Sequence, residues 1–291
     1  MAVLTSQKIK ELYTRYRDID VTFSKEIIAV SGLDPKQVYI KCVSDFFPCL
    51  IFSSSFGGAK VLLNIKSGII EKLQQANNAL SLRFCFKHYE TGQQVIFFVQ
   101  ARSLGHAPYN DSPDTAIFNL QYPQQPPDDY IEILGRILNA TVNSTRRREE
   151  RVIITPEVMR KLKLLTKDAV VFVDGVPRRC ILRDLSFSGA RIVMLGVAKF
   201  LEDRAVGLRV DFDDPQESFN IKGTFKHVET VEGRKDLVVL GIEFQAVIPM
   251  GYKLRLSDYL DTVKVFPANM NAPKPLVVHA GWDDPVNSAP I

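Results

Sequence analysis

The chain has little cysteine, and its four cysteines form no C-x-x-C pair, which argues against a zinc site or a disulfide framework. We expect all four to be reduced and structural, because most stand in apolar runs where a thiol behaves as a small hydrophobic group. Long apolar runs are also missing: the run 95–99 is far shorter than the roughly 20 residues of a membrane-spanning helix. The first residues lead directly into a polar helix, without the apolar stretch of a secretory signal. We therefore expect a cytoplasmic protein that does not insert into a membrane.

Patterns typical of enzymes are scarce as well. The four histidines stand far apart, without H-E-x-x-H or H-x-E spacing. They are His88, His106, His227 and His279. The segment 53–60 contains serines, glycines and a lysine, but it lacks the G-x-x-x-x-G-K-[ST] order and the following helix of a phosphate-binding loop. We interpret it as a hairpin connection, and we expect a protein that is not an enzyme and needs no cofactor or metal.

The length of 291 residues, with 46% hydrophobic content, is sufficient for two domains. Residues 1–140 are expected to form the first, a small antiparallel β-barrel or sandwich. It would begin with a short helix and contain one further helix, capped by Ser67. Its expected strands alternate apolar and polar residues or are rich in β-branched and aromatic ones. They are Val38–Val43, Phe46–Phe52, Lys60–Ile65, Leu80–Phe86, Gln94–Gln100 and Ala116–Gln121.

Residues 153–266 are expected to form a second small barrel. A threonine, a proline and a glutamate at 155–157 are typical of the start of a helix, which would extend to Leu165. Six strand patterns follow, with Asp174-Gly175 as a hairpin turn between the first two. The six are Ala169–Val173, Arg178–Asp184, Ala190–Leu195, Ala205–Phe212, Phe219–Thr230 and Leu237–Gln245. An amphipathic helix over about 256–263 would cover one end of this barrel. The whole chain is thus predicted to be mainly β, with two small antiparallel barrels joined by a helix and a basic linker.

The connection between the two domains begins with a proline-rich break at 122–129, which no central strand could contain. A helix over about 130–138 follows, and residues 141–152 are predicted to be the interdomain linker. Residues 267–291 have little periodicity and are expected to be a mobile tail. Within it, Trp282 is the residue best suited to contact a partner.

The linker contains the only dense basic cluster of a chain whose net charge is just +4. In the run 145–151, Arg147 and Arg151 form an R-x-x-x-R pair, and Arg146 precedes it. Guanidinium groups can bind phosphate oxygens bidentately and can stack on purine rings. The same spacing also occurs on the solvated face of an ordinary helix. The pair alone therefore indicates only a candidate anion site.

A second motif follows about thirty residues later, at the end of a predicted strand. Asp184, Ser186 and Gly189 form a D-x-S-x-x-G string. The carboxylate can accept hydrogen bonds from guanine N–H groups, the hydroxyl can donate to a phosphate, and the glycine allows a tight turn or a close approach. An ordinary turn after a strand explains the string equally well, because Asp and Ser readily bond to their own backbone.

In this order and context, the two motifs resemble the PilZ domain, the bacterial cyclic di-GMP receptor module, over about residues 145–265. The segment 183–192 matches the second motif of that family, and 240–244 is similar to its late strand. The helix predicted at 155–165 departs from the family, since it interrupts the usual passage from the arginine motif to the first barrel strand.

The resemblance implies a set of ligand contacts and an output. Arg147 and Arg151 would clamp cyclic di-GMP, and Arg146 could reach a second stacked ligand molecule. The pocket would be completed by Asp184, Ser186 and Gly189. The N-terminal domain resembles the β-rich domains that precede PilZ in flagellar-brake proteins and in spirochaetal receptors. By that resemblance it would present a surface to an unknown protein effector in motility or gene regulation.

The function predicted on these grounds is that of a second-messenger receptor. Cyclic di-GMP would order a disordered arginine linker and so change the orientation of the two domains. The alternative is a nucleic-acid-binding regulatory protein that uses the basic linker and the barrel surfaces.

Overall fold

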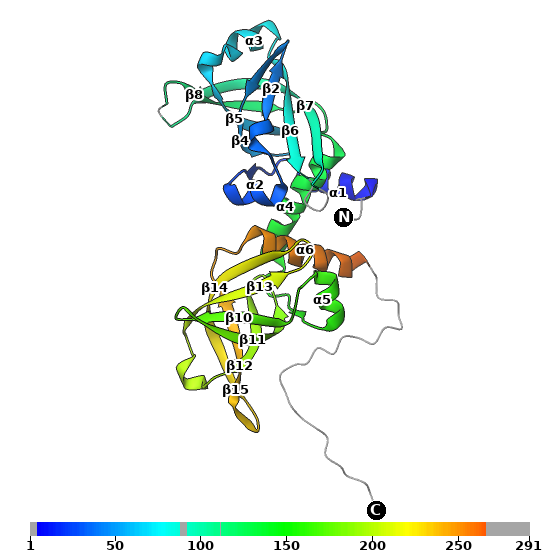
Figure 1. Cartoon of the computed structure of the whole chain (residues 1–291). Coiled ribbons are helices and arrows are strands. Elements are labelled where there is room, and N and C mark those ends of the chain that lie inside the picture. The colour runs from blue at the N-terminus through cyan, green and yellow to red at the C-terminus, as the bar shows by residue number, and fades with distance from the viewer. Residues whose placement is uncertain (1–4, 88–91, 111, 266–291) are drawn as a thin grey trace, which may run out of the picture.

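The computed structural model describes residues 5–87, 92–110 and 112–265. Two β-rich bodies, each with its own hydrophobic core, are joined by the long helix α4 (Asp128–Arg146), as Figure 1 shows. Trp282 and the rest of the expected tail after residue 266 lie outside the described residues. No helix in the described ranges is both long and apolar enough to cross a membrane.

The N-terminal body is built on one antiparallel sheet of eight strands, in the order β1-β4-β5-β8-β7-β6-β2-β3. The strands are β1 (Val21–Thr22), β2 (Tyr39–Cys42), β3 (Asp45–Pro48), β4 (Leu50–Ser54), β5 (Gly58–Asn64), β6 (Ala79–Lys87), β7 (Gln94–Pro108) and β8 (Thr115–Gln121). Within the described residues no pairing joins β1 to β3, so this sheet is open in its strand order and is not the closed barrel expected here. The single strand predicted at 46–52 is in fact β3 and β4. Pro48 cannot donate to a ladder, and β3 pairs with β2 whereas β4 pairs with β5.

The N-terminal body has three short α-helices before α4, of which the sequence predicted two, and two single 3-10 turns. They are α1 (Ser6–Tyr16), α2 (Lys25–Ser31), α3 (Ile69–Gln75) and the single 3-10 turns η1 (Pro35–Gln37) and η2 (Ile65–Ser67). The unpredicted helix, α2, has ordinary boundaries: the Ser24 hydroxyl accepts from the Ile27 N–H, and Gly32 ends the helix at φ 72°. The expected cap of α3 is wrong. Gly68 precedes that helix, and the Ser67 hydroxyl instead donates to the Asn64 carbonyl at 2.6 Å.

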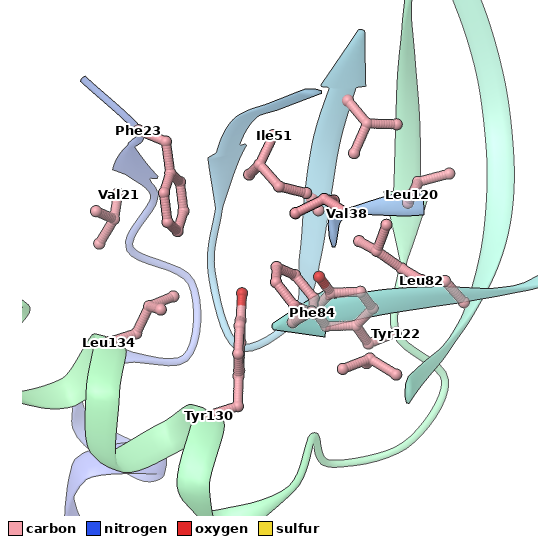
Figure 2. Close-up of a cluster of buried hydrophobic side chains, with 14 of the residues drawn as sticks. Val21, Phe23, Val38, Ile51, Leu82, Phe84, Leu120, Tyr122, Tyr130 and Leu134 are labelled. Carbon is pink, nitrogen blue, oxygen red and sulfur yellow. The ribbon is translucent and has the colours of Figure 1, made fainter. Parts of the chain in front are cut away.

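The first half of α4 belongs to the N-terminal core. Figure 2 shows Tyr130 projecting from this helix toward Phe84 and Tyr122. Its ring centre lies 4.9 Å from that of Phe84, and its hydroxyl donates to the Ser54 hydroxyl at 2.5 Å. Because the Tyr130 side chain is fully buried and its polar end is hydrogen-bonded, α4 is anchored firmly to this body.

The C-terminal body is a closed barrel, as predicted. Six strands pair in the order β10-β13-β14-β15-β12-β11, a pairing of β10 with β11 closes the circle, and β9 adds to β11. The elements are β9 (Val152–Ile153), α5 (Pro156–Leu162), β10 (Asp168–Val173), β11 (Val176–Leu185), β12 (Gly189–Leu195), η3 (Ala198–Phe200), β13 (Ala205–Phe212), β14 (Glu217–Val231), β15 (Arg234–Phe244) and α6 (Met250–Val265). Asp174 and Gly175 form the predicted hairpin turn, both with positive φ.

Helix α6 closes the end of the barrel that faces the N-terminal body (Figure 1). Tyr252, Leu256 and Leu260 are buried in the barrel core. The helix begins at Met250, six residues before the predicted start, because its first N–H donates to the carboxylate of Glu26 in the other body. No sequence pattern near residue 250 could indicate this start, because the capping carboxylate belongs to Glu26, far away in the sequence.

Helix α4 ends at Arg146, whereas the sequence predicted an end near residue 138. The additional turns are rich in Asn, Thr and Ser, which have low helix propensity. Packing against α6 overrides that propensity: the Asn143 side chain donates to the Ser257 hydroxyl at 2.8 Å, and Asn139 donates to the Asp261 carboxylate at 2.5 Å. The first part of the predicted linker is therefore helical and lies between the two bodies.

Candidate ligand-binding site

Arg151 is placed beside Asp184 by a short strand pairing. It directly precedes β9, whose two residues pair with Leu185 and Asp184 of β11. The Arg151 Nη1 donates to the Asp184 Oδ1 at 2.6 Å. From the other side, Arg191 of β12 lies opposite Asp184, with its Nε 3.9 Å from Oδ2. The nearly buried carboxylate is thus balanced by two guanidinium groups, as a buried charge requires.

Ser186 is fully buried, and its hydrogen bonds close the turn between β11 and β12. Its Oγ donates to the Gly189 carbonyl at 3.1 Å and accepts from the Gly189 N–H at 3.0 Å. Its own carbonyl accepts from the Tyr252 hydroxyl of α6 at 2.9 Å. Burial, reinforced by the nearby Asp184 charge, holds the pKa of Tyr252 well above its ordinary value, so this hydroxyl remains a donor. Ser186 therefore shapes the turn in this state.

Gly189 is required by the packing of the barrel. A Cβ at this position would lie 2.2 Å from the carbonyl oxygen of Ile242 in the neighbouring strand β15. Its φ does not lie in the left-handed region. The need for glycine thus comes from the close approach of two strands and not from an unusual backbone angle.

The other arginines lie at the C-terminal end of α4. Arg146 is its last residue and is exposed, while the Arg147 N–H donates to the Asn143 carbonyl at 2.8 Å and caps the helix. The Arg147 guanidinium donates through Nε and Nη2 to the two carboxylate oxygens of Glu150, and its Nη1 lies 3.8 Å from Asp261 of α6. The sequence predicted a disordered linker here. Instead, α4, β9 and these ion pairs give the segment a defined path.

One buried donor at the site lacks an acceptor. The Arg147 side chain is only 10% exposed, and among the described residues its Nη1 has no hydrogen-bond partner. A buried charged N–H without an acceptor is costly, and it marks a position where an anionic oxygen would be stabilised.

One contact that joins the two motifs was not predicted from the sequence. Ser188 stands at a position where the D-x-S-x-x-G motif allows any residue. Its hydroxyl donates a hydrogen bond to the Glu149 carboxylate at 3.1 Å. Glu149 and Glu150 stand between the two motif arginines. The Glu149–Ser188 hydrogen bond links the arginine segment to the barrel turn, as the Arg151–Asp184 pair does, so that both motifs form one continuous site.

Among the described residues, no group of three or more His, Cys, Asp or Glu side chains is arranged to hold a metal ion. The four cysteines are buried and unpaired by disulfides, and burial raises the pKa of Cys49 and Cys180 to about 12. At neutral pH these two thiols are therefore protonated and poor metal ligands.

The fold and the site define a two-domain chain whose barrel carries an arginine segment at its edge, and comparison with known proteins identifies the family. Residues 145–261 match the PilZ domain, and residues 7–141 match the PilZN3 domain. A protein of Treponema denticola named cyclic di-GMP binding protein is 44% identical over 266 residues, which cover 91% of this chain and 85% of that protein. The chain belongs to the PilZ family, in the two-domain form with an N-terminal PilZN3 domain.

The solved structures that match this chain are more distant from it in sequence. The PlzA protein of Borreliella burgdorferi in complex with c-di-GMP is 23% identical, with a TM-score of 0.41, covering 88% of this chain and 99% of that one. YcgR of Escherichia coli in complex with c-di-GMP is 12% identical, with a TM-score of 0.27, covering 89% of this chain and 88% of that one.

Proposed function

We propose that this protein is a receptor for cyclic di-GMP, bound where the arginine segment meets the β11–β12 turn. The observation that carries the proposal is the nearly buried Arg147 guanidinium, whose Nη1 lacks an acceptor, within one continuous site that also contains Arg151 and Asp184. The name of the Treponema denticola relative supports the same ligand. In this proposal the protein acts by binding and catalyses no reaction.

Each group has a role that follows from its chemistry. Arg147 and Arg151 bind phosphate oxygens through charge-assisted hydrogen bonds. On ligand binding, the hydrogen bond between Arg151 and Asp184 would break, or the Asp184 carboxylate would bond to Arg151 and the ligand together. In either case that carboxylate would accept hydrogen bonds from the N–H groups of a guanine. Ser186 and Gly189 support the turn on which these groups stand, and Arg146, exposed at the end of α4, is available to a second ligand molecule.

Isothermal titration of the full-length protein tests this proposal. Cyclic di-GMP should bind with saturable heat. Cyclic di-AMP lacks the guanine donors, and GTP lacks the cyclic ring with two phosphodiester groups, so each should bind at least about tenfold more weakly. Equal affinity for the three nucleotides would show that the site binds anions in general and does not recognise cyclic di-GMP. Absence of any binding would overturn the proposal.

The output that we propose is a change in the orientation of the two bodies. Figure 1 shows the end of α4 lying between them, next to α6. Asp261 of α6 lies 3.8 Å from Arg147 and also accepts from Asn139 of α4. A phosphate that binds the Arg147 guanidinium would offset part of its positive charge and so weaken the attraction between Arg147 and Asp261. The ligand would in this way bias the contact between α4 and α6.

Substitution of Asp261 tests this coupling. Asp261→Asn retains an acceptor for Asn139 but removes the charge that faces Arg147. With one dye on each body, cyclic di-GMP should change the energy transfer in the native protein, and the change should fall by about half or more in the variant. Asp258→Asn is the matched control, because Asp258 lies on the same helix and pairs with Arg136 at 2.6 Å. An equal ligand response in all three proteins would exclude this route.

The downstream role belongs to the same proposal. We propose that the reoriented PilZN3 body acts on a protein effector in motility or gene expression, in the cytoplasm. The nucleic-acid alternative has less support at the linker, because carboxylates lie within 4 Å of the guanidinium groups of Arg147, Arg148 and Arg151. A cluster neutralised in this way attracts a polyanion weakly.

A further inference from the structure

One carboxylate from within the chain occupies a proposed partner of the ligand, and a second bonds to the neighbouring barrel turn. Glu150 accepts from Nε and Nη2 of Arg147, and Glu149 accepts from the Ser188 hydroxyl. Both glutamates lie inside the R-x-x-x-R segment, so the same short stretch of chain supplies the arginines and the anions that pair with them.

A carboxylate and a phosphate compete for the same guanidinium edge, because each presents two oxygens at the spacing of two parallel N–H groups. The Nε–Nη2 edge of Arg147 cannot bind both at once. Its other edge includes Nη1, which lies within 4 Å of the Asp261 carboxylate. A phosphate approaching either edge therefore meets a negative charge that is already present.

Side-chain exposure indicates which partner moves. The Arg147 side chain is 10% exposed, whereas that of Glu150 is 46% exposed. Glu150 can turn into water and be hydrated, while Arg147 is held at the end of α4. Displacing Glu150 costs the free energy of a partly exposed ion pair, and that cost is subtracted from ligand binding.

From this arrangement we propose that Glu150, assisted by Glu149, is an internal competitor of cyclic di-GMP and sets the affinity of the site. The inference rests on the proposed function. In the ligand-free protein Glu150 occupies the Nε–Nη2 edge of Arg147, and it must leave when a phosphate binds that edge. The receptor thus responds at a higher second-messenger concentration than its arginines alone would dictate.

The test is titration of the full-length protein with cyclic di-GMP, with Glu150→Gln as the variant. The substitution removes the competing charge at nearly constant size, and we expect cyclic di-GMP to bind roughly three- to tenfold more tightly. Glu149→Gln should tighten binding less, because Glu149 contacts Ser188 and not a motif arginine. Glu157→Gln is the matched control: it removes the same charge from an exposed glutamate of α5 that pairs with Lys161, and its affinity should stay within about twofold of the native value.

The outcomes separate this inference from the function on which it rests. Native protein that does not bind cyclic di-GMP at all would overturn both. Native protein that binds, together with Glu150→Gln protein of unchanged or weaker affinity, would overturn only the competitor. Thermal melting of each variant without ligand shows whether it is folded. If Glu150 only supports the fold, Glu150→Gln should lower the melting temperature and weaken binding together. If Glu150 is a competitor, the same substitution should tighten binding, whatever its small effect on stability.

Discussion

Replacing Arg147 with alanine is expected to weaken cyclic di-GMP binding by about a hundredfold. The substitution removes a guanidinium that can make two charge-assisted hydrogen bonds to a phosphate, each worth about 1.5–3 kcal/mol net. A loss of about 3 kcal/mol corresponds to roughly a hundredfold change in the dissociation constant. The measurement is isothermal titration of the purified full-length variant beside the native protein. Undiminished affinity would remove Arg147 from the site.

Arg148→Ala provides the matched control, because it makes the same change in charge at the adjacent position. Arg148 is 60% exposed, and its contact with Glu149 is a long one of 3.5 Å. Its substitution should alter affinity by no more than about threefold, the range of a surface charge. If the two variants lost equal affinity, the cluster would attract the nucleotide by charge alone, and the bidentate role of Arg147 would be wrong.

Arg147 is a cleaner test position than Arg151. Loss of Arg151 would leave the nearly buried Asp184 with the more distant Arg191 as its one remaining ion-pair partner in the part of the chain that the structure describes. An incompletely paired buried carboxylate destabilises a protein, so weaker binding by an Arg151 variant would have two explanations. The carboxylate released by removing Arg147 is that of Glu150, which is partly exposed and can be hydrated.

The sequence indicated which residues belong to the candidate site, but it did not indicate which of them contact one another. Arg151 and Asp184 lie together because β9 pairs with β11, and that pairing involves two residues, too few to produce a recognisable strand pattern. Ser188 stands at an unspecified motif position, and its partner Glu149 is 39 residues away in the sequence. Such contacts depend on tertiary geometry, which local periodicity does not encode.

The same distinction explains the fold. The barrel strands were predictable because alternate residues face the core, as in β13, where Val206, Leu208, Val210 and Phe212 are buried. The second half of α4 was not predictable, because its stability comes from α6, more than a hundred residues later in the chain. Local propensity fails at the interface between the two bodies, which is also where a ligand-dependent change in orientation would act.

Replacing Gly189 with alanine is expected to lower the free energy of unfolding of the barrel by about 2–4 kcal/mol. The added Cβ would lie 2.2 Å from the Ile242 carbonyl oxygen, and that backbone atom can move only if the ladder between β12 and β15 opens. Urea unfolding of the full-length protein, followed by circular dichroism, measures the change. Because the turn also carries Ser186 and Ser188, binding of cyclic di-GMP should fall in proportion to the loss of folded barrel.

Gly57→Ala is the matched control for this substitution. Its added Cβ would meet only ordinary contacts, at 3.8 Å and beyond, and its φ is not in the left-handed region. Its unfolding free energy should therefore stay within about 0.5 kcal/mol of the native value, as for most neutral substitutions. An unchanged unfolding midpoint in Gly189→Ala protein that nevertheless loses cyclic di-GMP would contradict the packing explanation. In that case the glycine would instead be required by a close approach of the nucleotide to the turn.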